Sequence, residues 1–259
     1  MARRLALLDP RRGYDLVAPH FQSWYWSRFW RANEAPLVRR WLRELPSGLG
    51  LDAGAGCRPY AEAIAQAGHR AISADMSRSM LLQSRRRAPS RREDRVQADV
   101  RALPFGTGTF DWVLCTRVLS HLADFVPVFV ELARVLRAGG EMLVTDVHPG
   151  HPYEHVSVRT PGGLFNIETH KHRVDQVRAA AASVGMQVVH LEEYRTRNLV
   201  WQPSQREFRK LYRRPDAPVF YSLALRGGAS GKPSSSAASA SLVLRASDAI
   251  SAALREERS

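Results

Sequence analysis

Three aspartates, Asp52, Asp75 and Asp99, each follow a short predicted strand, and they recur at nearly equal intervals. Two glycines, Gly54 and Gly56, come directly after the first of them with one residue between them. Glycine lets the backbone turn sharply and lets a ligand approach without a Cβ atom in the way. Carboxylates at the carboxyl ends of neighbouring parallel strands can hold a nucleoside. The pattern therefore predicts a nucleoside site at one edge of a sheet.

The carboxylate of Asp52 sets this turn apart from a phosphate-binding turn. In a dinucleotide site the helix N-terminus faces a pyrophosphate, which a carboxylate at the strand end would repel. The third glycine of a dinucleotide fingerprint would fall at Pro59, where the sequence has no glycine. We therefore expect Asp52 to face the positively charged end of an adenosine-like ligand.

Asp75 lies about twenty residues past the glycine turn, where an acid typically accepts hydrogen bonds from ribose hydroxyls. It ends a predicted strand over 70–74, and Met76 comes directly after it. We expect Asp75 to hold a ribose, with Met76 in the same site. Because several cofactors contain a ribose, this acid alone does not separate NAD from a cationic nucleoside.

Residues 51–56, Leu-Asp-Ala-Gly-Ala-Gly, resemble motif I of the class I S-adenosylmethionine (SAM) dependent methyltransferases. Arg58 is a departure, since that motif usually has another glycine at its position. Asp99 together with Leu-Pro-Phe at 103–105 resembles the adenine-binding segment of the same family. The resemblance implies that Asp99 accepts from the adenine amino group and that the backbone amide of Val100 faces the ring. It continues in matching order to about Asp146.

Two more residues are assigned to the SAM site by this resemblance. Thr116 follows the strand predicted over 109–115 and would border the transferring methyl group. Tyr14 precedes an aromatic-rich segment and would lie near the methionine end of SAM, in a lid. Packing of that segment on the core is the alternative, and the two are compatible. After Thr116 the chain lacks the Asn/Asp-Pro-Pro-Tyr motif of many amino-methylating nucleic-acid enzymes. His121 either lines the pocket or packs as an ordinary histidine, and packing is the favoured interpretation.

Histidines and a tyrosine follow the fifth predicted strand, where an open α/β sheet typically binds its substrate. His148 and Tyr153 are the candidate general bases for removing a proton from the acceptor. A metal site from His148, His151, His170 and His172 is disfavoured, because no paired carboxylates or cysteines accompany them. Many methyl transfers need no base, since alignment of the reactants supplies most of the catalysis.

The predicted fold class is α/β. The resemblance implies a Rossmann-like class I methyltransferase fold: a seven-stranded, mainly parallel sheet with helices on both faces and an antiparallel last strand. The expected strands are 48–52, 70–74, 95–98, 109–115, 141–146, 186–194 and 220–226. The expected helices are 36–45, 60–67, 124–136 and 173–185.

Domain organisation follows from the same elements. We expect an N-terminal helical lid over 1–46 and a methyltransferase domain over 47–226. Within that domain we expect substrate-side insertions at 147–171 and 195–218, and after it a flexible linker at 227–241 and a tail with a short helix at 242–259. The linker and tail are expected to contribute nothing to the chemistry.

Composition limits the setting of the protein. The 259 residues carry a formal charge of +13, but the arginines responsible are scattered, so a nucleic-acid partner is not favoured. Cys57 and Cys115 suit a reducing compartment better than a disulfide framework. No apolar run approaches the roughly 20 residues of a membrane helix, and the N-terminal apolar run is too short for a signal peptide. The cytoplasm is the expected location, and the oligomeric state is not predicted.

The function predicted from these observations is methyl transfer from SAM to an oxygen, nitrogen or carbon of a small molecule, with specialised metabolism as one setting. A SAM-binding protein without methyl transfer, acting on partner enzymes, is the alternative from another class. An RNA methyltransferase is a further alternative that the positive charge suggests, and an NAD(P) oxidoreductase is a distant one.

Overall fold

The computed structural model describes residues 6–87, 94–152, 154–200 and 216–228. Tyr153, most of the expected insertion over 195–218, the expected tail and nearly all of the expected linker lie outside the described residues.

A seven-stranded sheet forms the centre of the molecule, with strand order β4-β3-β2-β5-β6-β10-β9. Its strands are β2 (Leu49–Ala53), β3 (Arg70–Asp75), β4 (Asp94–Gln97), β5 (Phe110–Thr116), β6 (Leu136–Val147), β9 (Met186–Arg195) and β10 (Pro218–Gly227). The pairs from β4 to β6 are parallel, while β10 is antiparallel to both of its neighbours. The predicted fold class, including the reversed last strand, is confirmed.

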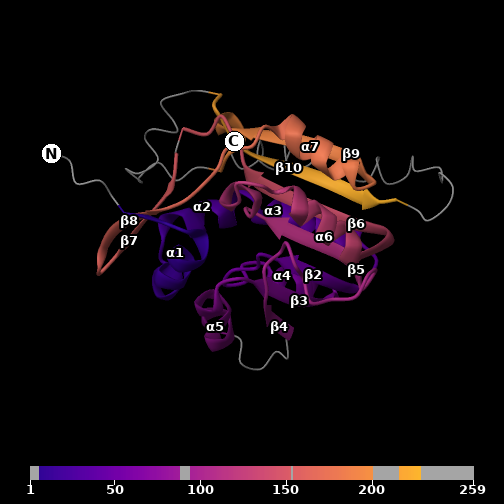
Figure 1. Ribbon diagram of the computed structural model, residues 1–259, viewed down its shortest axis with the longest axis horizontal. Helices are drawn as coiled ribbons and strands as arrows, with labels where there is room; N and C mark the ends of the chain where they lie inside the picture. Colours follow the sequence, from indigo (N-terminus) through magenta and orange to yellow (C-terminus); the bar gives the residue numbers. More distant parts are fainter. Residues whose placement is uncertain (1–5, 88–93, 153, 201–215, 229–259) are drawn as a thin grey trace.

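Helices cover both faces of this sheet (Figure 1). On one face pack α6 (Val126–Val135) and α7 (Val174–Ser183), and on the other α2 (Tyr25–Asn33), α3 (Ala35–Glu44) and α4 (Ala61–Gln66). A further helix, α5 (Arg78–Arg87), contacts β3 and β4.

The strands alternate between the two cores, as buried strands must. Val113 and Cys115 belong to the core under α6 and α7, whereas Trp112 and Leu114 belong to the core under α2, α3 and α4. Gly50 is paired with Trp112, and a Cβ atom on it would lie 2.0 Å from the indole ring. This glycine therefore makes room for the largest fully buried side chain of the sheet.

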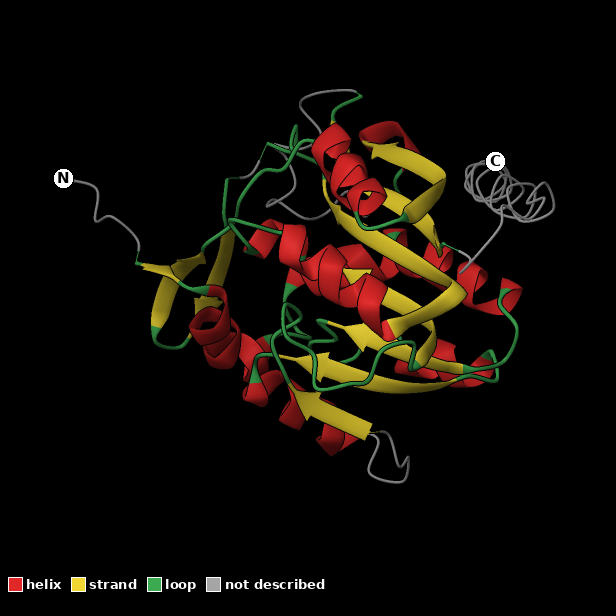
Figure 2. Cartoon of the chain, turned by 45° about the vertical axis from the view of Figure 1, so that its right-hand side comes forward, coloured by secondary structure: helices red, strands yellow, loops and turns green. Residues whose placement is uncertain are grey.

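A second sheet was not predicted. It has three strands, β1 (Leu7–Leu8), β7 (Val156–Thr160) and β8 (Gly163–Ile167), in the order β1-β8-β7. Figure 2 shows it standing apart from the large sheet, beside the N-terminal helices. The Pro161-Gly162 pair between β7 and β8 is a turn signal that the sequence carried.

The small sheet joins two parts of the chain that are distant in sequence. Leu7 pairs with Asn166 in parallel register, and α1 (Pro10–Val17) packs against the inner face of β7 and β8. A Cβ atom on Gly13 would lie 2.6 Å from Ile167 Cγ1, so the approach of α1 requires that glycine. The expected helical lid thus contains a strand, and it is continuous with the expected insertion over 147–171. We call α1 together with β1, β7 and β8 the flap.

Candidate functional site

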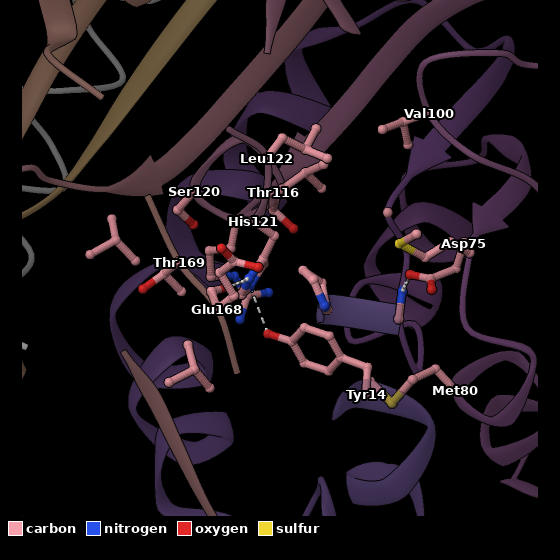
Figure 3. Close-up of a pocket in the computed structure, with 18 of the residues that line it drawn as sticks. Tyr14, Asp75, Met80, Val100, Thr116, Ser120, His121, Leu122, Glu168 and Thr169 are labelled. Atoms are coloured by element: carbon pink, nitrogen blue, oxygen red, sulfur yellow. Dashed lines mark hydrogen bonds between the residues drawn. The ribbon is translucent and has the colours of Figure 1, made fainter. Parts of the chain in front are cut away.

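A cavity of about 520 Å³ opens at the carboxyl ends of the parallel strands. Its wall comes from the N-terminal segment over 9–30, the glycine turn after β2, the segments after β3, β4 and β5, and the segment from Val147 to Lys171. In Figure 3, Asp75, Met80 and Val100 lie on one side of this cavity, and Ser120, His121 and Glu168 lie on the other. We call these sides the donor half and the acceptor half.

The glycine turn has the geometry that the sequence predicted. Gly54 and Gly56 line the cavity with φ angles of +70° and +52°, in the region that favours glycine. A Cβ atom on Gly54 would lie 2.2 Å from Val118 Cγ2. Arg58, in place of the usual third glycine, also has a positive φ of 62°. Its buried side chain points beneath the turn, where Nε donates to Ser73 Oγ at 2.8 Å.

Asp75 is held in place by the turn. The backbone amides of Gly56 and Ser77 each donate to one of its carboxylate oxygens at 2.7 Å. Burial raises the pKa of this carboxyl group, although those two hydrogen bonds oppose the shift. Each oxygen keeps further acceptor capacity, and Asp75 and Met76 both line the cavity. The carboxylate is therefore placed to accept from a ribose.

Asp99 and Val100 line the next part of the donor half, as expected, but Asp99 has a partner that the sequence did not suggest. Arg101 donates two hydrogen bonds to its carboxylate, from Nε at 3.0 Å and from Nη2 at 2.6 Å. This contact holds the pKa of Asp99 below its usual range. An adenine amino group would have to share this carboxylate with the guanidinium.

Asp52 lies behind the wall of the cavity and not on it. The residue is only 1% exposed and is absent from the lining residues. Burial raises its pKa to about 7, with Arg58 and Arg117 opposing the shift. Its Oδ2 atom has no hydrogen-bond partner among the described residues. In this structure, any influence of Asp52 on a bound ligand acts through charge and not through contact.

The acceptor half contains a pair of side chains that the sequence did not connect. Tyr14 and His121, 107 positions apart, lie with the hydroxyl 2.8 Å from Nε2 (Figure 3). The Nδ1 atom of His121 faces the carbonyl oxygen of Glu168 at 3.1 Å, so Nδ1 carries the proton and donates. Nε2 is then the acceptor for the Tyr14 hydroxyl. The prediction that His121 is an ordinary packed histidine is thus corrected, because it lines the cavity.

Burial sets the charge state of this pair. It raises the pKa of the Tyr14 hydroxyl above its usual range and lowers that of His121 to about 4. At neutral pH the imidazole is therefore unprotonated at Nε2. The pair is a neutral hydrogen-bonded chain that can take up a proton from the cavity.

The turn that carries His121 is held on both sides. This short 3₁₀ helix, η2 (Leu119–His121), donates from the Ser120 amide to Asp146 Oδ2 at 2.9 Å. The Ser120 carbonyl accepts from the His170 amide at 2.7 Å. The Nε2 atom of His172 faces the carbonyl oxygens of Leu119 and Leu122. These contacts fix the position of His121 without using its side chain.

The expected base His148 lines the cavity, but both of its nitrogens are occupied. Nδ1 accepts from the Gly150 amide at 3.0 Å, and Nε2 lies 3.5 Å from Glu193 Oε2. Burial lowers the pKa of His148. Tyr153 lies outside the described residues, so its role as a base remains a prediction. In this structure the histidine with a ring nitrogen that faces a tyrosine hydroxyl in the cavity is His121, and His148 has other partners.

Aromatic side chains complete the cavity wall. Phe21, Trp24, Trp26 and Trp30 line it, and the ring of His151 lies 5.8 Å from that of Trp26. Burial lowers the pKa of His151 to about 3, so this ring is also neutral. Lys171 donates to the His151 carbonyl and to Glu154. No group of three or more metal-ligating side chains suited to an ion occurs in the part of the chain that the structure describes.

The donor half fits the cofactor that the resemblance implies. Gly54 and Gly56, both at positive φ, present bare backbone to the cavity, and Asp75 offers acceptor capacity beside it. Thr116, at the end of β5, also lines the cavity. None of the helices in the described part of the chain has the length and apolar character that crossing a membrane requires.

Comparison with known proteins gives the same result. A family model for the methyltransferase domain matches residues 51–144. A demethylmenaquinone methyltransferase of Corynebacterium urealyticum is 33% identical over 164 residues, which cover 58% of this chain and 67% of that protein. A demethylmenaquinone methyltransferase of Mycolicibacterium gilvum is 34% identical over 46% of this chain and 49% of its own. The chain thus spans about half to two thirds of the length of these two relatives.

Solved structures share the fold at lower identity. A [4+2]-cyclase, SpnF, superposes with a TM-score of 0.64 at 18% identity, covering 87% of this chain and 98% of its own. A SAM-dependent methyltransferase of Mesorhizobium loti does so with a TM-score of 0.55 at 19% identity, covering 73% and 95%. The glycine turn, the strand-end acids, the strand order and the sequence relatives agree: the chain belongs to the class I SAM-dependent methyltransferases.

Proposed function

We propose that this protein transfers a methyl group from SAM to a hydroxyl-bearing aromatic small molecule, and that Tyr14 and His121 take up the proton that the acceptor loses. The observation that carries the proposal is the Tyr14–His121 pair inside the cavity. Because His121 Nδ1 donates to the Glu168 carbonyl, Nε2 is the unprotonated nitrogen that faces Tyr14. The two demethylmenaquinone methyltransferases act on a small molecule by their names, and a further relative, of Legionella pneumophila, is a malonyl-[acyl-carrier protein] O-methyltransferase.

The donor half would hold the cofactor. Gly54 and Gly56 would admit it, Asp75 would accept from its ribose, and the segment of Asp99 and Val100 would hold its adenine. When bound, SAM supplies an electrophilic methyl group on a sulfonium, which an acceptor atom attacks in line. Thr116 and Tyr14 border the two halves, so the acceptor atom is expected near the Tyr14 hydroxyl.

The proton has a short route from the acceptor. The acceptor hydroxyl donates to the Tyr14 oxygen, and Tyr14 passes its own proton to His121 Nε2. The imidazolium then keeps its hydrogen bond from Nδ1 to the Glu168 carbonyl. A base with a pKa of about 4 suits an acceptor that becomes strongly acidic only as the new bond forms. It suits an ammonium acceptor poorly, because that group must lose its proton before it can attack.

The wall of the acceptor half indicates the kind of acceptor. Trp24 is partly exposed, the buried Trp26 and Trp30 line the wall beside it, and the neutral His121 and His151 rings add to this aromatic lining, which suits an aromatic acceptor. The same surfaces offer little to a nucleic-acid backbone, which is bound mainly by lysine and arginine contacts to phosphates. This wall supports a small-molecule acceptor over RNA.

The location is proposed from the two cysteines. Cys57 and Cys115 are both free and buried, which suits a reducing compartment such as the cytoplasm. Recovery of the protein in the soluble fraction, with both thiols reactive only after unfolding, would support this location.

The test measures methyl transfer from labelled SAM to a panel of phenols, naphthols, hydroquinones and matched anilines. We expect turnover with hydroxyl compounds, and we expect His121→Asn and Tyr14→Phe to lower kcat about 100- to 10,000-fold. Both variants should bind S-adenosylhomocysteine as tightly as the wild type does. His20→Gln is the matched control, because His20 is exposed and lies outside the cavity wall. Full turnover in both His121→Asn and Tyr14→Phe would contradict the role given to the pair.

A further inference from the structure

The residue after Thr116 has a backbone conformation that directs its side chain. Arg117 has a φ angle of +57°, in the left-handed region that non-glycine residues rarely adopt. Its amide donates to the Thr145 carbonyl at 2.7 Å, which ties this conformation to β6. Arg117 lines the cavity, and Val118, one position on, fills the space beside Gly54. Arg117 therefore lies in the cavity wall, in the same segment as the side chain that packs against the glycine turn.

One edge of the guanidinium is held by a buried network. Its Nε atom lies 3.1 Å from Oε2 of Glu34, a side chain with 0% exposure. Thr145 Oγ1 donates to the other Glu34 oxygen at 2.5 Å, and the Tyr60 hydroxyl also donates to Glu34. The Cζ atom of Arg117 lies 5.1 Å from the centre of the Trp30 ring. An ion pair and a cation–π contact thus fix where this charge stands.

The other edge of the guanidinium is unused. A guanidinium has five N–H donors, yet among the described residues only Glu34 contacts its polar atoms, through Nε, and neither Nη group has a hydrogen-bond partner there. The side chain is 17% exposed and lines the cavity. The other long cations of the wall are engaged, Arg101 with Asp99 and Lys171 with His151 and Glu154.

We propose that Arg117 is the receptor for a carboxylate inside the cavity, which it binds through its two Nη groups. The planar fork of arginine matches the two oxygens of a carboxylate. The identity of the carboxylate rests on the proposed function: it is either the amino-acid tail of the methyl donor or an acid group on the acceptor. The place of Arg117 beside the glycine turn favours the donor tail.

The test compares two nucleosides that differ only in the carboxylate. These are S-adenosylhomocysteine and its decarboxylated form, S-adenosyl-3-thiopropylamine. We expect the wild type to bind the first about 10- to 100-fold more tightly by calorimetry. Arg117→Met should remove most of this preference while leaving the affinity for the decarboxylated form unchanged. Arg117→Lys should keep part of the preference, because it keeps the charge without the fork.

A second variant guards against a folding defect. Arg117→Met leaves Glu34 buried and unpaired, which is strongly destabilising. The double variant Glu34→Gln with Arg117→Met removes both charges, and it should fold and still lose the preference for the carboxylate.

The remaining outcomes separate the two sources of the carboxylate and the two proposals. Suppose that the wild type binds both nucleosides equally, but binds benzoate more tightly than benzamide when S-adenosylhomocysteine is saturating. If Arg117→Met removes that difference, the carboxylate belongs to the acceptor. If Arg117→Met changes neither preference, the receptor role is overturned. A wild type that binds neither nucleoside contradicts the proposed function instead.

Discussion

The two halves of the cavity are built in different ways. Every residue assigned to the donor half from the strand-end pattern lies between Asp52 and Thr116, on consecutive strands and the turns that follow them. The acceptor half joins the N-terminal part of the flap, β1 and α1, to the segment over 147–171. The first half is specified by local spacing and the second by long-range packing. Changes in the donor half should therefore alter cofactor affinity, and changes in the acceptor half should alter turnover or acceptor affinity.

The largest expected effect is in the donor half. Gly54→Val requires a β-branched residue at φ +70° and puts a side chain where Val118 Cγ2 now lies. We expect a loss of about 100-fold or more in affinity for S-adenosylhomocysteine, because the strain alone costs about 1–3 kcal/mol. Gly162→Ala is the control, since Gly162 has no positive φ and its nearest neighbour is 3.6 Å away. If Gly54→Val binds S-adenosylhomocysteine as tightly as the wild type does, the donor half does not hold the cofactor as proposed.

Asp75→Ala comes next. It removes the acceptor expected to hold the ribose and leaves two backbone amides of the turn without their partner. We expect a loss of about 1–3 kcal/mol in the free energy of cofactor binding, measured by calorimetry with S-adenosylhomocysteine. Asp175→Ala, on the exposed start of α7, should bind as the wild type does. An unchanged affinity in Asp75→Ala would remove this residue from the site.

In the acceptor half, the expected effect is a dependence of stability on pH. The pKa of His121 falls from 6.5 to about 4 on folding, so the unfolded chain binds more protons between these values. Its contribution to stability is complete above about pH 6.5 and is lost as the pH falls toward 4. His121→Gln should flatten the fall in the free energy of unfolding over this range, measured in urea at several pH values. A slope identical to that of the wild type would mean that His121 is not buried as described.

The smallest effect is expected in the flap. Gly13→Ala places a Cβ atom 2.6 Å from Ile167 Cγ1 and should loosen α1 from β8, at a cost of about 1–3 kcal/mol. Hydrogen exchange should accelerate at Leu8 and Ile167 while protection of β2 and β5 is unchanged. Adding Ile167→Ala should restore part of the protection, because it removes the clashing atoms. Faster exchange throughout the large sheet would show that the flap is not a separate unit.

The difference between local spacing and long-range packing also explains which parts of the site could be predicted from the sequence. Strand ends, turn glycines and their acids obey local rules, so the positions of Asp75, Asp99 and both glycines follow from spacing. Tyr14 was placed by resemblance, but its partner His121 was not found, because a contact across 107 positions leaves no local pattern. The flap was missed for a similar reason, since β1 has only two residues and is paired with a strand near the middle of the chain.

Asp52 shows a limit of charge reasoning from sequence. A lone acid after a strand suggested a direct partner for a cation. The fold instead buries it between Arg58 and Arg117, which sequence spacing does not reveal. The sequence relatives and the fold therefore separate this SAM site from a phosphate-binding site better than Asp52 does.

The arginine in the third glycine position of the turn has a consequence for the catalytic cycle. Arg58 and Arg117 oppose the charge of Asp52, whereas Asp75 and Glu34 add to it. Arg58 therefore lowers, without cancelling, the negative potential that the floor below the glycine turn offers to a sulfonium. We expect the spent cofactor to compete more strongly with fresh donor here than it would with a glycine at this position.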